Sequence, residues 1–141
     1  MAQTNPEPWL RGPIQGVHAF VMPVFFTFTQ VREELASQSA GLSHEQVWRK
    51  MHGTAPLGFH IKHIAGSVDR LTTYLLNRQL NEEQMQFMRE EVADDSGLDG
   101  LLGLMNGALD RSEKQLREID PASLCPPKQV FTILAKGLAS S

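Results

Sequence analysis

Apolar residues recur at every third or fourth position in three long stretches of the chain, which is the period of an amphipathic helix. No stretch alternates apolar and polar residues with the period of two that a half-buried strand requires. The first stretch starts at Pro13, and its apolar positions are Val17, Val21, Val24, Phe28, Val31 and Leu35. Pro23 lies inside it and predicts either a kink or the true first turn, because proline has no N–H to donate. The pattern predicts an all-α fold.

The second stretch predicts a helix from about Pro56 to Asn77, and the third predicts one over 98–120. The core face of the second helix is expected to carry Leu57, Ile61, Ile64, Val68, Leu71 and Leu75. In the third helix, three glycines each cost about 1 kcal/mol relative to alanine. They are Gly100, Gly103 and Gly107, and we expect them to allow a close approach between helices.

Capping signals predict two short helices between the long ones. Ser43 and Gln46 have the spacing of a capping box, and Asn81 is a second N-cap. Trp48 and Met51 are expected to cover one end of the core.

An acidic cluster precedes the third long helix and comprises Glu90, Glu91, Asp94 and Asp95. Its spacing does not match a calcium loop, so it is interpreted as a solvated linker. Asp95 or Ser96 is expected to cap the helix that follows.

Length and composition indicate one domain over residues 1–141, with an extended N-terminal arm over 1–12 and a short C-terminal segment over 126–141. The net charge of −3, with both signs interspersed, does not indicate a basic surface for binding nucleic acid. The apolar run over 17–28 is shorter than the roughly 20 residues that cross a bilayer. The single cysteine, Cys125, cannot form an internal disulfide. A reducing cytoplasm is therefore the expected location.

His60 and His63 lie three residues apart on the second long helix, where they share a polar stripe with Ser67 and Tyr74. Such a stripe faces the groove towards a neighbouring helix. A stable zinc or nickel site needs at least three protein ligands, so two histidines are too few. On spacing alone, boundary histidines bonded to water or to a hydroxyl are the more common outcome.

His18, on the first helix, is a candidate third ligand because the axes of adjacent helices lie about 8–10 Å apart. The competing interpretation is a histidine at the edge of the core, bonded to a backbone carbonyl. His44 and His52 are expected to face solvent. Cys125 has no basic neighbour closer than Lys128 and is expected to be an inert thiol.

Several segments together resemble the DinB-like superfamily of metal-dependent proteins. They are "EPWLRGPIQGVHAFVMPVFFTFTQVREEL", "LSHEQVW", "LGFHIKHIAGSVDRLTTYL" and "ALDRSEKQLREIDPASL", which cover roughly residues 7–124. The resemblance implies a four-helix bundle with a long crossover, a divalent metal that is commonly zinc or nickel, and often a homodimer. Characterised relatives include transferases and isomerases that use low-molecular-weight thiols.

In that family one histidine of the second long helix and an H-x-x-x-H pair on the fourth helix hold the metal. The first maps onto His63, but all five histidines of this chain lie at or before residue 63. The resemblance therefore implies an up-down helical bundle whose fourth helix is shortened or missing. The groove that this leaves could be covered by the apolar residues Val130, Phe131, Ile133, Leu134 and Leu138, or by a second copy of the chain.

Two functions follow as hypotheses. The first is a DinB-like metal-dependent enzyme, of the thiol-dependent transferase or hydrolase type, or a truncated relative with an incomplete three-histidine site formed by His63, His60 and His18. The second is a non-catalytic, self-associating helical bundle with a structural or interaction role, in which the histidine stripe serves packing alone.

Overall fold

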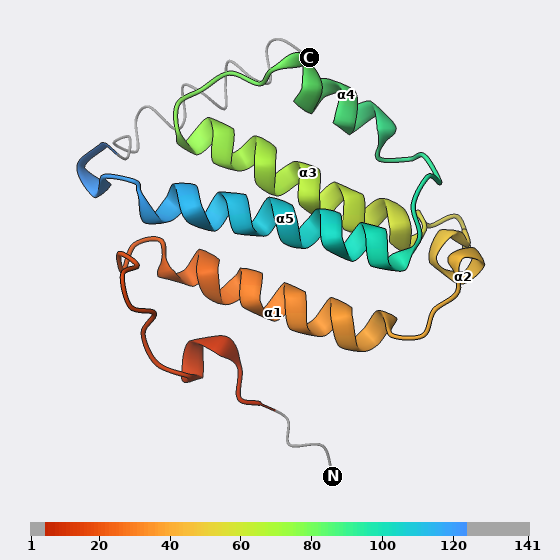
Figure 1. The fold of residues 1–141 in the computed structure, drawn as a ribbon, viewed down its shortest axis with the longest axis horizontal. Helices are drawn as coiled ribbons and strands as arrows, with labels where there is room; N and C mark the ends of the chain where they lie inside the picture. Colours follow the sequence, from red (N-terminus) through yellow and green to blue (C-terminus); the bar gives the residue numbers. More distant parts are fainter. Residues whose placement is uncertain (1–4, 124–141) are drawn as a thin grey trace.

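A computed structural model describes residues 5–123 of the chain, and within them five α-helices and two short 3-10 helices form a bundle (Figure 1). The elements are η1 (Pro8–Leu10), α1 (Met22–Ser39), α2 (His44–Trp48), α3 (Leu57–Leu75), α4 (Glu82–Glu90), α5 (Leu98–Arg117) and η2 (Pro121–Ser123). The described residues contain no strand, which confirms the all-α prediction. None of the described helices combines the length and the apolar character needed to cross a membrane.

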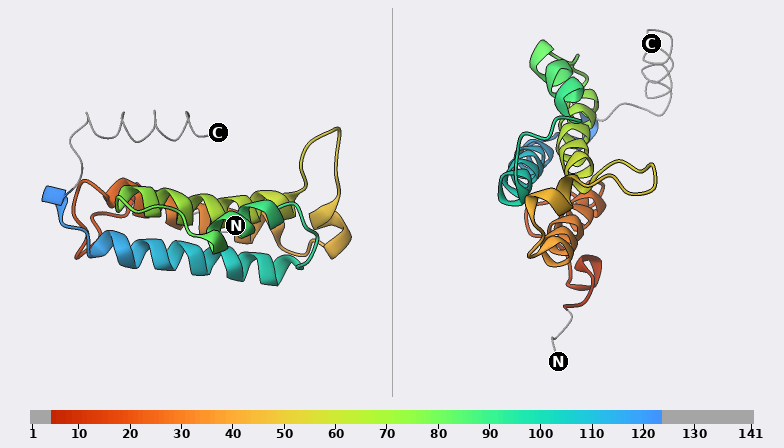
Figure 2. Two further views of the ribbon diagram at one scale, coloured as in Figure 1. Left: turned by 90° about the horizontal axis from the view of Figure 1, so that it is seen from above. Right: turned by 90° about the vertical axis from the view of Figure 1, so that its right-hand side faces the viewer.

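The three long helices lie side by side, with α3 and α5 parallel and α1 antiparallel to α5 (Figures 1 and 2). The Thr72 and Ser112 hydroxyls, 2.6 Å apart, join α3 to α5. Arg32 of α1 bonds to Asp110 and Glu113 of α5, each at 2.6 Å. The predicted up-down order does not hold for α3 and α5, since they point the same way. The segment between them, which contains α4, therefore returns along the length of the bundle. We call residues 76–97 the crossover.

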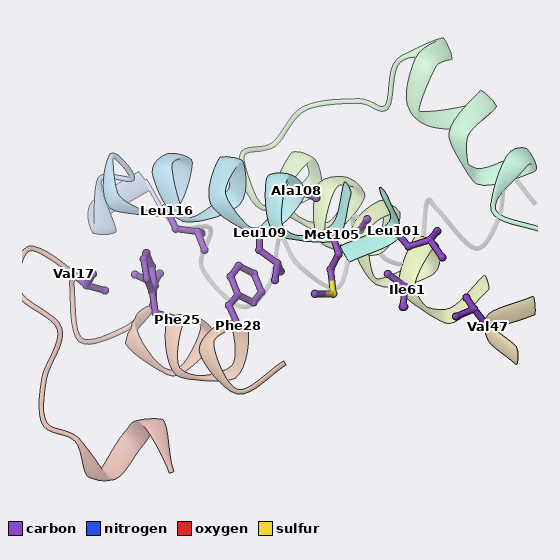
Figure 3. Close-up of a cluster of buried hydrophobic side chains, with 12 residues drawn as sticks. Val17, Phe25, Phe28, Val47, Ile61, Leu101, Met105, Ala108, Leu109 and Leu116 are labelled. Carbon is purple, nitrogen blue, oxygen red and sulfur yellow. The ribbon is translucent and has the colours of Figure 1, made fainter. Parts of the chain in front are cut away.

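The core lies between the three long helices and is apolar along its whole length (Figure 3). Its buried members are Val17, Val21, Phe25, Phe28, Val47, Ile61, Ala65, Leu101, Met105, Ala108, Leu109 and Leu116. The predicted capping box of Ser43 is present, because Ser43 Oγ accepts from the Gln46 N–H, and the predicted N-cap Asn81 accepts from the Gln84 N–H.

The first long helix starts later than the predicted Pro13, since residues 13–21 form turns and α1 begins at Met22. Pro23 occupies the first turn of α1, where its missing N–H costs no helical hydrogen bond. Of the two interpretations of Pro23, the true first turn is therefore confirmed and the kink is wrong. The N-cap of α5 is Gly97 and not Asp95 or Ser96.

The predicted core face of α3 is wrong at its C-terminal end, because Leu71 is 66% exposed and Leu75 is 44% exposed. Lys62 and Gly66 are buried instead, since the crossover covers their side of the helix. Met51, which was expected to cover the core, is exposed, whereas Trp48 packs against α3.

The close approach predicted for the glycines of α5 occurs on α3. A Cβ at Gly103 would have no neighbour within 4 Å. A Cβ at Gly58 would lie 2.6 Å from the Trp48 ring, and one at Gly66 would lie 2.9 Å from the Phe87 ring. Cys125 and the apolar residues predicted to cover the groove lie outside the described residues.

Candidate functional site

A buried carboxylate joins the crossover to α3. Glu91 directly follows α4, and its side chain is 3% exposed. Glu91 Oε2 lies 2.8 Å from His63 Nδ1, and Glu91 Oε1 accepts from Arg70 Nη1 at 2.8 Å. Burial of a carboxylate is costly unless both oxygens meet donors. The two partners on α3 therefore satisfy Glu91.

One side of α3 is built to receive the crossover, because Lys62, Gly66 and Arg70 follow one another at spacings of four residues. Lys62 Nζ donates to the carbonyls of Glu90 and Ala93, at 3.0 and 2.8 Å. These bonds fix the backbone on either side of Glu91. Gly66 leaves room for the carboxylate, since a Cβ there would overlap Glu91 Oε1.

Lys62 also pairs with Asp95, whose Oδ1 lies 2.7 Å from Nζ. The hydrogen bond from Lys62 lowers the pKa of Asp95 from its ordinary value. The Lys62 ammonium also lies over the Trp48 ring, 5.6 Å from its centroid. A buried ammonium is thus surrounded by two carbonyls, a carboxylate and an aromatic face.

His63 is held in one orientation while half of its side chain, 50%, remains exposed. Its ring stacks on Phe59 with centroids 5.5 Å apart and planes 13° apart. Because a carboxylate only accepts hydrogen bonds, the bond to Glu91 places a proton on His63 Nδ1. In the neutral imidazole the lone pair then resides on Nε2, which lies 3.3 Å from Ser67 Oγ. Such a nitrogen can accept a proton or ligate a metal.

The other two predicted metal ligands have different neighbours. His60 is exposed, and its ring meets the edge of Phe59 with centroids 5.4 Å apart. His18 is in the turns before α1, where its Nδ1 accepts from the Phe20 N–H. Arg117 bonds to the carbonyl of Gln15, which places this turn at the C-terminal end of α5. His63 belongs to the N-terminal half of α3, and α3 runs parallel to α5, so its part of α3 lies beside the other end of α5 (Figure 1).

The remaining described histidines are exposed, as expected. His44 Nε2 lies 2.6 Å from Asp94 Oδ1. His52 occupies the loop before α3 with a left-handed backbone, φ 49°.

The described residues provide one suitable metal ligand, but they do not form a complete metal site. His63 has the carboxylate-bonded geometry that is usual for a ligating imidazole. Within residues 5–123, however, no three His, Cys, Asp or Glu side chains are grouped to hold an ion. A complete site would therefore need ligands from elsewhere.

Sequence reasoning missed Glu91 and Lys62 as parts of this site. The interpretation of residues 90–95 as a solvated linker is wrong for Glu91, because its carboxylate is buried against α3. A usable signal was present, since Lys62, Gly66 and Arg70 put two cations and a gap on one side of the second helix. That arrangement indicates an anionic partner that approaches closely.

Comparisons with protein-family models, with curated proteins and with solved structures find no match. The resemblance to the DinB-like superfamily therefore rests on the sequence segments alone.

Proposed function

We propose that this chain is a DinB-like protein in which His63 binds a divalent metal ion, zinc or nickel. The observation that carries the proposal is the bond between His63 Nδ1 and the buried Glu91 carboxylate. Metal-ligating histidines nearly always donate their second ring N–H to such a group, which fixes the tautomer and the ring orientation. The lone pair on Nε2 of this half-exposed side chain would then bind the metal.

The proposed activity is that of a thiol-dependent transferase or hydrolase. Because no three candidate ligands are grouped among the described residues, at least one further ligand would come from elsewhere, for example from a second copy of the chain or from the thiol substrate. A thiolate is a preferred ligand of zinc. When bound, the metal would supply a thiolate or hydroxide nucleophile at neutral pH.

Metal titration of untagged protein, with and without a low-molecular-weight thiol, tests the proposal. We expect stoichiometric binding of Zn²⁺ or Ni²⁺ by calorimetry, and loss of binding in His63→Ala. His44→Ala is the matched control, because His44 is exposed, contacts Asp94 and not Glu91, and is not a candidate ligand. Glu91→Gln should weaken binding by about 10- to 100-fold. If His63→Ala binds metal as tightly as the unmodified protein, the proposal is wrong.

A second candidate function, a self-associating bundle without catalysis, is supported by the outward face of α3. Leu71, Tyr74 and Leu75 are large, apolar or aromatic, and exposed at 44% or more. Grouped exposed residues of this kind commonly mark contact surfaces. This face would be the contact between two copies of the chain.

Light scattering after size-exclusion chromatography tests self-association. We expect a dimer mass for the unmodified protein and a monomer mass for Leu71→Glu. Val92→Glu is the control, because Val92 is equally exposed but lies on the crossover. A monomer at high micromolar concentration would rule out this second function.

A further inference from the structure

A cavity of about 620 Å³ lies between the loop that precedes α3 and the turn that follows α4. Its apolar walls are Trp48, Pro56, Phe59 and Val92, and its charged lining residues are Lys50 and Asp94. Pockets for small molecules usually have 300–1,000 Å³, mostly apolar walls and a few polar groups. This cavity has the size and the largely apolar lining of such a pocket, and it is open to solvent, since most of its lining residues are exposed.

Local backbone features hold the walls in place. The loop over 49–56 stands out from the bundle and turns back at His52 and Gly53, whose φ angles are 49° and 76° (Figure 2). Trp48 packs directly onto α3 at Gly58, and its Nε1 donates to the Ser96 carbonyl at 2.8 Å. One wall is therefore fixed on both sides before any ligand enters.

Two charged side chains, Lys50 and Asp94, line the cavity. Asp94 Oδ1 already lies 2.6 Å from His44 Nε2. No ion pair of Lys50 is found among the described residues, so its ammonium is the charged group that can meet a ligand. A positive group beside flat apolar walls suits an anion that carries an aromatic or other planar body.

We infer that this cavity binds a small organic anion with a flat apolar body, with Lys50 as the partner of the anionic group. Phe59 lines the cavity and also stacks on His63, with ring centroids 5.5 Å apart. A ligand in the cavity therefore lies one aromatic ring away from the candidate site. The inference concerns binding alone and does not require the metal proposed above.

Binding of 8-anilinonaphthalene-1-sulfonate, a flat anion, tests the inference. Trp9→Phe leaves Trp48 as the single tryptophan, so quenching of its fluorescence reports occupation of the cavity. We expect saturable 1:1 binding, unchanged by EDTA. Lys50→Gln should weaken it about tenfold, equivalent to about 1.4 kcal/mol. The uncharged N-phenyl-1-naphthylamine should bind correspondingly less tightly.

Two control variants separate the cavity from other surfaces. Lys114→Gln removes an exposed charge from α5 and should leave binding unchanged. Leu71→Glu alters the outward face of α3 and should also leave it unchanged. Circular dichroism confirms that each variant is folded. If Lys50→Gln binds as the unmodified protein does, if Leu71→Glu abolishes binding, or if binding never saturates, the inference is wrong. Failure of metal binding would leave it unaffected.

Discussion

Helix α3 contacts α5 and the crossover in two different ways. Towards α5 it presents Ile61 and Ala65 to an apolar core, and one hydroxyl pair is the polar exception. Towards the crossover it presents Lys62, which donates to the carbonyls of Glu90 and Ala93. It also presents Arg70, which pairs with the buried carboxylate of Glu91. Apolar contacts tolerate a change of partner if volume is kept, but a buried charge that loses its partner is strongly destabilising.

The apolar contact mainly stabilises the fold, whereas the charged contact fixes where the crossover lies on α3. Burial of apolar area drives the pairing of α3 with α5 and needs no specific partner. The charged contact is satisfied only when the crossover takes one position, because each donor has its own acceptor. The same position brings Glu91 to His63. The crossover contact therefore serves the candidate site as well as the fold.

The largest expected effect is that of Lys62→Met, which keeps the apolar stem and removes the ammonium. Two carbonyls, those of Glu90 and Ala93, lose their shared donor. We expect a loss of about 2 kcal/mol in the free energy of unfolding, because buried acceptors without partners cost about 1–3 kcal/mol each and water reaches part of this site. Urea denaturation measures the loss.

Hydrogen exchange shows whether the loss is local, since amides 90–95 should exchange faster than those of α5. Lys114→Met, at an exposed position of α5, is the control and should change stability by less than about 0.5 kcal/mol. If Lys62→Met is as stable as the unmodified protein or more stable, the charged contact positions the crossover without stabilising the fold.

Two glycine substitutions should have the next largest effects, and they should change the free energy of unfolding in opposite directions. Gly66→Ala puts a Cβ 2.7 Å from Arg70 Nη1 and 2.9 Å from the Phe87 ring. Overpacking costs about 1–3 kcal/mol and the gain in helix propensity returns about 1, so we expect a net loss of about 1 kcal/mol. Gly103→Ala meets nothing within 4 Å and should gain up to about 1 kcal/mol. Thermal melts of both variants test this, and two gains would contradict the close approach at Gly66.

The smallest effect is the pH dependence due to Asp95. Its pKa is lowered in the folded state by Lys62, so its contribution is present above the unfolded-state value of about 3.9 and is lost as the pH falls through the folded-state pKa. Asp95→Asn should therefore lower stability at pH 7, by less than about 1 kcal/mol because the side chain is half exposed. The difference from the unmodified protein should disappear in acid. In a Lys62→Met background the same substitution should have a smaller effect, because only the hydrogen bonds from Ser96 and the backbone then remain, and an undiminished effect would exclude the pair as its main cause.

The elements that depend on local pattern could be predicted from the sequence. The period of apolar residues predicted α3 and α5, and capping residues predicted the starts of α2 and α4. The exposure of Leu71 could not be predicted, because periodicity shows that a face is apolar and not which neighbour covers it. The burial of Lys62 depends on the return of the crossover along α3. This return is a feature of the tertiary structure, which a local sequence pattern does not show.

The candidate site was predicted less completely. His63 was chosen from its helix face and from the family resemblance, and its tie to Glu91 spans 28 residues of sequence that carry no shared pattern. Whether His63, His60 and His18 ligate a metal stays a prediction. The structure does not bring His18 to His63, because the turn that carries His18 lies at the C-terminal end of α5.

The parallel course of α3 and α5 has a consequence for the folding pathway. Partners such as Thr72 and Ser112 are 40 residues apart in sequence, so this central pairing cannot form as a local helical hairpin. The chain must first close a long loop, at an entropic cost that no contact has yet offset. Contacts between distant residues slow folding, so this protein is expected to fold more slowly than an up-and-down bundle of equal size.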